Sequence, residues 1–531
     1  MLIGLALLAY VGYFLVYTHY AAALFRFPFD YDQGEGFELA DTLMLSRGEW
    51  PYQDIEAYPF YSSNYPPIFH IAVVPLVWLF GPEYWTGRAV AYAGTLITAA
   101  LIGLAVKRAS GRWWLALLSG LAFLASNYIY HVGPLFRQHL FMLMFETAAV
   151  VLAARVIESE EWSARRNNWG WLGVVLLLLA AGYTKQLAYA TVAAVFIFLF
   201  LRQPKRAVAW AAGFAAAAAG LFFLINWATG GHWLLNTVTA NLNPFLPGQS
   251  LALYLQWLKL HTVLAVVAAG MAVYQLYFER LSAYAIWFVV AVANAATAGK
   301  WGAGESYFAT AVAASCLLTG VAFGRLLDWA RGRSFRLEAF AAVVVALLFL
   351  VQAARFFHMP THTPWLRAIA LSLGKAPESV VRVQTSCSEP WPPVSVAYID
   401  SADVGLLGRP PTPADTAAGV AISQLIAEGD TPAFSEEAGF NLYLGRDVVT
   451  NPTQLLNLYQ NNQVELGQML AMLEDQAFDT VVLRAQFYPP PVLEAIGRNY
   501  HTSHLVQMNG FVYCVLRPND PLPAEASSFP G

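Results

Sequence analysis

The chain has 531 residues, of which 58% are hydrophobic, 15% are aromatic and only 12% are charged. Soluble globular proteins carry roughly 25% charged residues, so this composition predicts a polytopic membrane protein. The net charge of -4 and the scattered basic residues argue against a nucleic-acid partner. Cys316, Cys387 and Cys514 are too few for a disulfide framework or a metal-binding array, and whether Cys387 and Cys514 pair or are separate thiols stays open.

Hydrophobic stretches of about 20 residues, enough to cross the hydrocarbon core of a bilayer, recur along the chain. We count about eleven by this criterion, near residues 2–24, 88–106, 114–130, 139–156, 169–184, 186–201, 207–226, 253–277, 283–298, 305–323 and 338–357. The apolar run Pro66–Gly81 is only about 16 residues long, so we predict an interfacial segment there. The first stretch lacks a basic region and a clear cleavage site, which favours a retained span over a signal peptide.

Charge bias predicts the orientation of these spans. With eleven spans the basic loops fall on one side of the membrane: Lys107, Arg108, Arg112, Arg165, Arg166, Arg202, Lys205, Arg206, Arg280, Arg325, Arg331, Arg333 and Arg336. Cytoplasmic loops are enriched in lysine and arginine, so this side and the N-terminus are predicted to be cytoplasmic. The loop 25–87 and the C-terminal part would then lie outside the cytoplasm, in the cell envelope of a multi-pass membrane protein.

The pattern changes after His358, where hydropathy falls and prolines predict a linker over residues 358–374. Pro360 lies between His358 and His362, which favours a linker over a helical metal pair. We therefore expect a membrane domain over residues 1–357 and an external α/β domain over residues 375–531. Its expected strands are 394–399, 432–435, 479–483 and 511–516, its expected helices are 419–428, 453–474 and 491–500, and this order predicts a small, partly parallel sheet.

An acidic cluster, Asp30–Glu35, follows the first span directly. Acidic side chains at a membrane boundary are either solvated by the headgroup layer or kept for chemistry. Asp32 could accept a proton from an incoming hydroxyl or amine, while a second acid or a divalent cation steadies a phosphate leaving group. The alternative is that Asp30 and Asp32 only cap the amphipathic juxtamembrane helix that follows.

Further polar residues occur in other loops of the same predicted face. Lys185 lies in a very short turn, and Lys300 lies among glycines in Gly299–Gly302. An ammonium is a point-charge partner for phosphate, but lysines at helix ends also extend to lipid headgroups, so both interpretations stay open. Asn243 suits contact with a sugar or an acceptor and is equally an ordinary loop residue. The C-terminal part has no common catalytic motif, which leaves acceptor binding, covering of the membrane site or a structural role.

Several stretches together resemble the GT-C membrane glycosyltransferases, the closest kinds being protein O-mannosyltransferases and aminoarabinose-transferase-like proteins. They are Tyr31–Gly34 after the first span, Arg47–Asp54, Tyr65–Ile68, Tyr183–Gln186 and Gly299–Phe308. The resemblance covers the membrane domain and depends on the order and shared sidedness of motifs that are individually unspecific. It implies a polytopic α-helical, GT-C-like fold with about eleven transmembrane helices.

The resemblance also implies an enzyme, a hexosyl- or pentosyltransferase that is mannosyltransferase-like. It would transfer a sugar with inversion from a polyprenyl-phosphate donor to a protein, lipid or glycan acceptor on the external face. Asp32 maps onto the family's general base, with Gln33 in place of the usual second acid and Glu35 as its substitute. A further family acid is replaced by Arg137–His139, so a divalent cation (Mg²⁺ or Mn²⁺) on Asp32 and Glu35 is left open.

The remaining roles follow from the same resemblance. Lys185, Arg137 and Lys300 are expected to bind the donor phosphate. Contacts with the sugar or the acceptor are expected from Gln138, His139, Asn243 and Tyr307.

Two other functions remain open. A transporter or flippase of lipid-linked precursors would carry charged residues near mid-span and internal repeats. Glu146 is the clearest ionisable residue inside a span, and no repeat is evident. A non-catalytic membrane scaffold would not require the polar residues of one face to converge, whereas the enzyme requires Asp32, Arg137, Lys185 and Lys300 to reach one phosphosugar.

Overall fold

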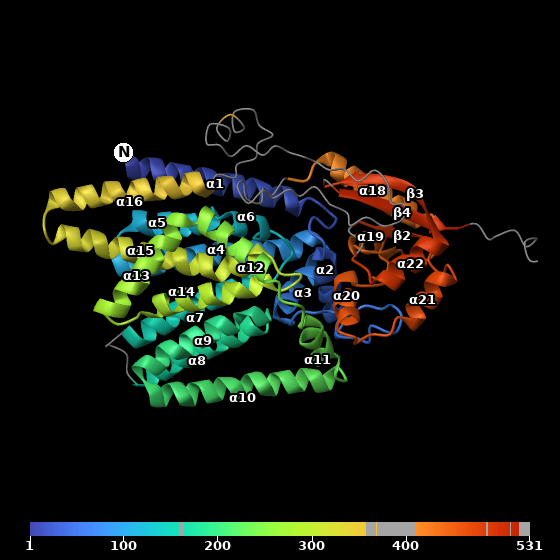
Figure 1. The fold of residues 1–531 in the computed structure, drawn as a ribbon, viewed down its shortest axis with the longest axis horizontal. Coiled ribbons are helices and arrows are strands. Elements are labelled where there is room, and N and C mark those ends of the chain that lie inside the picture. Colours follow the sequence, from blue (N-terminus) through green and yellow to red (C-terminus); the bar gives the residue numbers. More distant parts are fainter. Residues whose placement is uncertain (159–163, 357–367, 369–409, 485–486, 510, 520–531) are drawn as a thin grey trace, which may run out of the picture.

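A computed structural model describes residues 1–158, 164–356, 368, 410–484, 487–509 and 511–519. A helical bundle forms one end of the molecule and a smaller mixed domain forms the other (Figure 1). Within the described ranges, six helices are long and apolar enough to cross a membrane: α1 (Leu2–Phe25), α4 (Tyr84–Ser110), α7 (His139–Glu158), α10 (Pro204–Ala228), α15 (Ala309–Arg331) and α16 (Phe335–Phe356). The chain is therefore a multi-pass membrane protein.

Five shorter apolar helices belong to the bundle: α3 (Ile68–Phe80), α5 (Trp113–Leu124), α8 (Ala164–Gly182), α9 (Tyr189–Arg202) and α14 (Ala283–Asn294). Four of them coincide with predicted spans, and the fifth, α3, is the run expected at the interface. The sequence thus placed each apolar helix, although these five are shorter than a full span.

The prediction of a single continuous span over residues 253–277 is wrong. Two helices, α12 (Pro247–Leu260) and α13 (Thr262–Phe278), meet there at an angle of 96°. His261 lies at the bend, where its Nε2 is 2.8 Å from Ser126 Oγ and its Nδ1 is 3.0 Å from the Trp257 carbonyl oxygen. A buried histidine with fixed polar partners anchors the bend, and hydropathy averaged over the whole run hides it.

Short elements line the end of the bundle that faces the smaller domain. They are α2 (Glu35–Ser46), α6 (Asn127–Val132), α11 (His232–Thr237) and the 3₁₀ turns η1 (Gln186–Ala188), η2 (Thr239–Asn241), η3 (Ala295–Gly299) and η4 (Glu305–Phe308). The loops that carry the candidate site residues connect these elements, so they meet at one end of the bundle.

Local sequence explains several helix ends. Pro204 occupies the first turn of α10, where its missing N–H costs no hydrogen bond. α4 ends at Gly111, which adopts the left-handed conformation with φ 70°. Thr412 and Asp415 form a capping box at the start of α18 (Pro413–Ala427).

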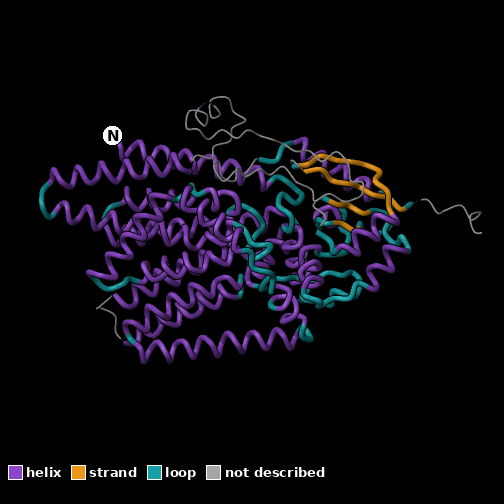
Figure 2. The backbone as a smooth tube through the Cα atoms, in the orientation of Figure 1, coloured by secondary structure: helices purple, strands orange, loops and turns teal. Residues whose placement is uncertain are grey.

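The smaller domain contains a four-stranded sheet in the order β1-β2-β4-β3, and Figure 2 shows the strands confined to this end of the molecule. The strands are β1 (Phe434–Ser435), β2 (Val481–Leu483), β3 (Tyr500–Met508) and β4 (Phe511–Pro518). β1 pairs with β2 in parallel, and the other two pairs are antiparallel, which confirms a small mixed sheet. Its helices besides α18 are α19 (Gly439–Tyr443), α20 (Pro452–Gln460), α21 (Gly467–Glu474) and α22 (Pro490–Asn499).

Two details of this domain differ from the prediction. The expected helix 453–474 is interrupted between α20 and α21, where Asn462 has a positive φ of 54° that ends helical geometry. The strand β3 was missed because it is a largely exposed edge strand whose hydrophobic pattern is weak. The expected strand 394–399, the linker with His358 and His362, the boundary at residue 375, and Cys387 all lie outside the described residues.

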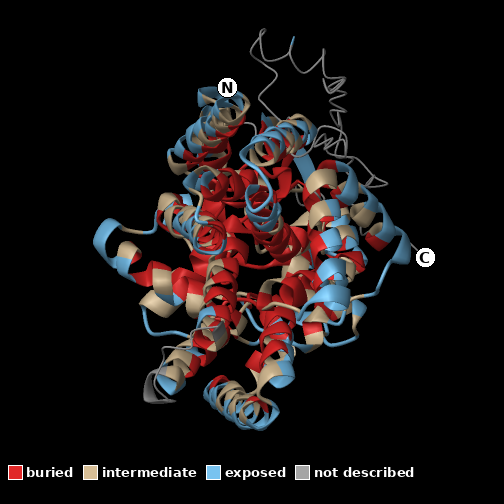
Figure 3. Cartoon of the chain, turned by 90° about the vertical axis from the view of Figure 1, so that its left-hand side faces the viewer, coloured by how far each residue is buried: buried red, intermediate tan, exposed pale blue. Residues whose placement is uncertain are grey.

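The buried core continues from the bundle into the smaller domain, and Figure 3 shows buried residues concentrated at the centre of the bundle. Phe29, just after α1, packs against Phe440 of α19 with ring centroids 5.8 Å apart. Asp30 Oδ2 accepts hydrogen bonds from Gly439 N at 2.9 Å and from Tyr84 Oη at 2.8 Å. The acidic loop is therefore fixed between the two parts of the molecule.

Candidate active site

Asp32 lies in the loop between α1 and α2, and its side chain is 38% exposed. Arg137, from the loop before α7, donates to Asp32 Oδ2 through Nε at 2.9 Å and through Nη2 at 2.5 Å. Burial alone would raise the pKa of Asp32, but the surrounding groups, among which the positive charge of Arg137 has the largest effect, outweigh it and hold the pKa below its ordinary value. Asp32 is therefore an ionised carboxylate that solvent can reach.

Gly34 permits the close approach of Arg137 to this loop. It is the N-cap residue of α2 and has a left-handed φ of 107°. A Cβ at this position would lie 2.8 Å from Arg137 Nη1. Arg137 also donates to the carbonyl oxygen of Gln33, so the guanidinium is held by the loop main chain as well as by Asp32.

Glu35 has a different environment from Asp32 and is fully buried. Its Oε1 accepts from Arg88 Nε at 2.9 Å and from Phe136 N at 2.6 Å. Its Oε2 accepts from Arg88 Nη2 at 2.8 Å and from Tyr31 N at 3.0 Å. Protein donors occupy both oxygens, so these contacts favour a positioning role for Glu35 over the assisting or metal-binding role that the sequence suggested.

Arg88, near the start of α4, was missed by the sequence analysis. It is fully buried and donates to the carbonyl oxygens of Leu24 at 2.6 Å, Phe27 at 2.5 Å and Phe29 at 2.8 Å. It thereby ties the end of α1 and the following loop to Glu35. A charged residue inside an apolar span is the signal that could have identified it.

Lys185 lies in the turn between α8 and η1 and is only 4% exposed. Its Nζ lies 4.3 Å from the centre of the Tyr65 ring. Burial lowers the pKa of Lys185 to about 7, Glu38 raises it, and Arg137 and Lys300 lower it further. Glu38, Arg137 and Lys300 therefore lie within electrostatic range of Lys185, which is buried and not extended toward headgroups.

A cavity of about 240 Å³ opens beside Lys185. Lys300, Asn243 and Tyr307 line it, together with Asn64, Tyr65, Asn241 and Trp301. Asn243 Nδ2 donates to the Trp301 carbonyl oxygen at 3.1 Å. This hydrogen bond joins the two loops of the cavity wall that carry Asn243 and Trp301. The structure thus brings Lys185, Lys300, Asn243 and Tyr307 to one cavity from loops far apart in the sequence.

Gln138 and His139 follow Arg137 into the interior. Gln138 is fully buried. Burial raises the pKa of Glu38 to about 7, against the smaller lowering effects of Arg137, Lys185 and Gln138. His139 begins α7, and its Nε2 lies 3.3 Å from Ser306 Oγ in η4. His139 thus links the start of α7 to η4, the element that carries the cavity residue Tyr307.

Glu146, the ionisable residue expected inside a span, is buried in α7. Thr191 Oγ1 donates to its Oε1 at 2.7 Å, and Thr310 Oγ1 donates to its Oε2 at 2.8 Å. Hydroxyls from α9 and α15 thus satisfy the carboxyl group and join three helices. These contacts account for Glu146 as a packing residue.

The smaller domain contributes a charged residue that the sequence analysis did not identify. Arg484, directly after β2, is 6% exposed, and its Nη1 lies 2.9 Å from Glu437 Oε1. The guanidinium also lies over the Phe511 ring at 4.1 Å. Its charge helps to lower the pKa of Asp32, after the larger effects of burial, which raises it, and of Arg137. The C-terminal domain therefore contributes to the electrostatics of the site.

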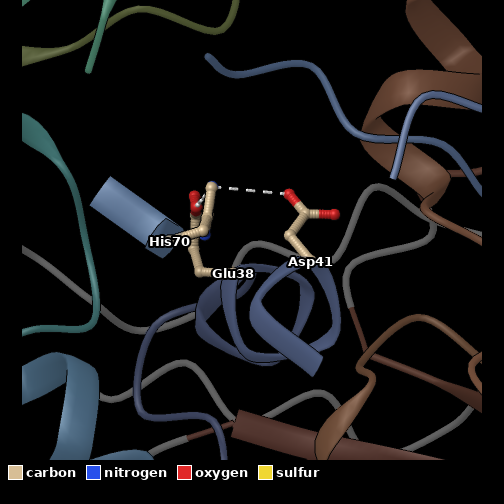
Figure 4. Close-up of side chains that lie close together, drawn as sticks. All are labelled: Glu38, Asp41 and His70. Carbon is tan, nitrogen blue, oxygen red and sulfur yellow. Dashed lines mark ion pairs between the residues drawn. The ribbon is translucent and has the colours of Figure 1, made fainter. Parts of the chain in front are cut away.

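One group in the described part of the chain places three potential metal ligands within 4.8 Å of one another: Glu38, Asp41 and His70 (Figure 4). Asp32 and Glu35 do not belong to it, since arginines occupy their carboxylates. The geometry therefore gives no support to a metal site on Asp32 and Glu35, which the sequence left open.

Neither a family model nor a curated protein sequence matches this chain. Solved structures do match it over almost its whole length. ArnT from Cupriavidus metallidurans, bound to undecaprenyl phosphate, superposes with a TM-score of 0.58 at 13% identity, over 96% of this chain and 98% of ArnT. The chain has the GT-C fold. This confirms the fold that the sequence motifs resembled.

A second GT-C protein extends the comparison. The archaeal oligosaccharyltransferase AglB from Archaeoglobus fulgidus, in complex with an inhibitory peptide and a dolichol-phosphate, superposes with a TM-score of 0.52. The identity is 12%, over 99% of this chain and 74% of AglB. At these identities the GT-C likeness establishes the fold, and the chemistry has to be argued from this chain's own residues.

Proposed function

We propose that this chain is a glycosyltransferase that transfers a sugar from a polyprenyl-phosphate donor to an acceptor. The observation that carries the proposal is the convergence of Asp32, Arg137, Lys185 and Lys300 at one end of a GT-C bundle. The two similar structures, ArnT and AglB, were solved with undecaprenyl phosphate and dolichol-phosphate bound. A base next to several cations suits a reaction whose leaving group is a phosphate.

Asp32 is the general base of the proposed reaction. It takes the proton from the acceptor as the acceptor's oxygen or nitrogen forms a bond to the anomeric carbon. The bond from that carbon to the phosphate oxygen breaks, and its electrons leave with polyprenyl phosphate. Attack opposite to the leaving group inverts the anomeric configuration. Arg137 lowers the basicity of Asp32 before the donor binds, so a phosphate that draws Arg137 away would strengthen the base.

Lys185, Arg137 and Lys300 bind the donor phosphate in this proposal. Burial destabilises the Lys185 ammonium, and an anion in the cavity would restore its preference for the charged form. Cations that are already in place stabilise the negative charge that develops on the leaving phosphate in the transition state. This lowers the activation barrier without reorganisation of the site.

Gln138, His139, Asn243 and Tyr307 contact the sugar or the acceptor in this proposal. Asn243 and Tyr307 line the cavity with amide and phenol groups, which suit sugar hydroxyls. Gln138 and His139 follow Arg137 directly in sequence, and His139 Nε2 lies 3.3 Å from Ser306 Oγ, the residue before Tyr307. The ion pair of Glu35 and Arg88 holds the base loop, the loop between α1 and α2 that carries Asp32, in place.

The site lies on the extracytoplasmic face in this proposal. The opposite end of the bundle carries the arginine-rich loops, where Arg112 pairs with Asp328 at 2.6 Å and with Glu338 at 2.9 Å. Basic loops favour the cytoplasmic side. The C-terminal domain would then cover the site from the cell envelope.

The test compares sugar transfer by the purified protein and by the variant Asp32→Asn, with polyprenyl-phosphate sugars as donors and lipid, glycan and peptide acceptors. Loss of a general base is expected to lower kcat by about 10²–10⁴-fold while donor binding persists. Asp54→Asn is the matched control, since Asp54 is exposed in the next loop, between α2 and α3, and its Oδ1 accepts from Glu56 N at 3.0 Å.

Two results would contradict the proposal. Transfer by Asp32→Asn at the wild-type rate would remove Asp32 from the base role. Movement of lipid-linked sugars across proteoliposomes by the wild type, without any transfer, would favour the transport function instead.

A further inference from the structure

Glu38 and Asp41 on α2 point toward His70 on α3, and the three side chains meet in the interior (Figure 4). His70 Nε2 lies 3.3 Å from Glu38 Oε2 and 3.6 Å from Asp41 Oδ2. The imidazole is 0% exposed and the two carboxylates are 3% and 4% exposed. Two carboxylates this close in a buried site repel each other unless a positive charge lies between them.

Hydrogen bonds determine which ring nitrogen of a neutral His70 carries the hydrogen. Thr42 Oγ1 donates its single hydrogen to the Glu38 carbonyl oxygen at 2.8 Å, so it can only accept from His70 Nδ1 at 3.3 Å. A neutral imidazole has one N–H, which is therefore on Nδ1. Nε2 then presents a lone pair to the two carboxylates and, within the described residues, has no hydrogen-bond donor facing it.

The carboxylate of Asp41 is also held in place. Tyr61 Oη donates to its Oδ1 at 2.7 Å, and Ser63 Oγ donates to its Oδ2 at 2.5 Å. These contacts fix the direction of the oxygen that faces His70. Three lone-pair atoms, from Glu38, Asp41 and His70, are thus preorganised around one point.

We propose that Glu38, Asp41 and His70 bind a divalent transition-metal ion, with Zn²⁺ as the best fit. Zinc bonds to imidazole nitrogen and carboxylate oxygen are about 2.0–2.2 Å long, and tetrahedral bonds of that length place ligand atoms about 3.3–3.6 Å apart. His70 Nε2 lies 3.3 Å from Glu38 Oε2 and 3.6 Å from Asp41 Oδ2, and both separations match this spacing. Mg²⁺ prefers octahedral oxygen ligands and several retained waters, so the imidazole ligand and the burial of the three side chains disfavour it.

The surroundings of His70 agree with a metal ligand. A ligating histidine usually donates its other ring N–H to a second group, and Thr42 takes that place here. Three protein ligands leave a fourth position for water. The ion would join α2 to α3 and so fix the end of the bundle that carries Asp32.

The metal would also redistribute charge toward the proposed active site. Glu38 Oε1 lies 3.6 Å from Arg137 Nη1, so an ion on Glu38 Oε2 weakens the hold of Glu38 on Arg137. Arg137 would then be more available to Asp32 and to a phosphate. Only this last consequence rests on the proposed function, whereas metal binding follows from the cluster alone.

The test measures zinc in the purified, full-length protein by elemental mass spectrometry after chelation, zinc re-addition and desalting. The wild type is expected to retain about one ion per chain, and His70→Gln and Asp41→Asn are expected to lose it. Thr42→Val should keep the ligands but weaken zinc affinity by about 10–100-fold. His19→Gln, which changes an exposed histidine, is the matched control and should retain the ion.

Cobalt gives a second readout, because tetrahedral Co²⁺ has visible absorption bands that should appear in the wild type and not in His70→Gln. Size-exclusion chromatography checks that each variant is folded. If His70→Gln does not fold, Thr42→Val replaces it as the test variant. The proposal is overturned if monodisperse wild type takes up no zinc or cobalt, or if Thr42→Val and Asp41→Asn both bind zinc as tightly as wild type. Sugar transfer is not needed for any of these measurements, so failure here is distinct from failure of the Asp32 test.

Discussion

At the scale of single residues, Asp32 and Glu35 show how neighbours decide chemistry. Both are carboxylates of one short loop, yet Asp32 is 38% exposed and Glu35 is enclosed by Arg88 and main-chain amides. The sequence identified the acidic loop and selected Asp32. It could not separate the two roles, because Arg88 lies 53 positions from Glu35 and only the fold brings them together.

Lys185 leads to a prediction about pH. Its pKa falls from 10.5 to about 7 through burial, so the free protein loses this charge as the pH rises above about 7. Phosphate binding favours the ammonium, and binding must then take up a proton. The Kd for undecaprenyl phosphate is therefore expected to rise with pH above about 7, by up to about tenfold per unit.

The measurement is a binding titration at several pH values, with Lys185→Arg for comparison. A guanidinium stays charged, so this variant should bind with little dependence on pH. The phosphate itself gains charge up to about pH 7, which would tighten binding and so has the opposite sign. An equal rise in Kd for Lys185→Arg would refute the role of Lys185.

At the scale of elements, α2 is the helix that joins the base loop to the rest of the site. Gly34 caps the start of α2 and Gly48 follows its end, and both glycines have positive φ, 107° and 81°. Only Gly34 has Arg137 against it, since a Cβ at Gly48 would meet no atom within 4 Å. Gly34→Ala is expected to lose about 1–3 kcal/mol of stability and to displace Arg137, with a fall in sugar transfer.

Gly48→Ala is the matched control for this prediction. It introduces the same backbone strain at the other end of α2, so its melting temperature should fall while transfer per folded molecule is unchanged. Thermal unfolding and transfer rates measure the two effects separately. A loss of transfer in Gly48→Ala as large as in Gly34→Ala would show that strain in α2, and not contact with Arg137, is responsible.

At the scale of the whole molecule, the C-terminal domain places Arg484 near Asp32 and holds the base loop through Asp30 and Gly439. Removing the positive charge of Arg484 should raise the pKa of Asp32. Arg484→Gln alone would leave buried Glu437 without its ion-pair partner, with Tyr513 Oη still donating to its Oε2 at 2.9 Å, at a cost of about 3–5 kcal/mol. The double variant Arg484→Gln/Glu437→Gln is therefore preferable.

In that double variant the acid limb of the pH–rate profile is expected to move to higher pH, by up to about 1 unit. Arg517→Gln is the control, because Arg517 bonds to Thr480 Oγ1 at 2.7 Å and to the Leu425 carbonyl oxygen at 2.7 Å within the same domain. An unchanged acid limb in the double variant would mean that the domain covers the site without tuning its base.

The sequence by itself determined the membrane character, the apolar helices and the mixed sheet, because these follow from local hydrophobic patterns along the chain. It also singled out Asp32, Lys185 and Lys300 as polar residues in loops of one face. The 96° bend at His261 and the roles of Arg88 and Arg484 were decided only by the tertiary structure. Each depends on a partner far away in the sequence, and no local pattern records which distant side chain will satisfy a buried charge or ring.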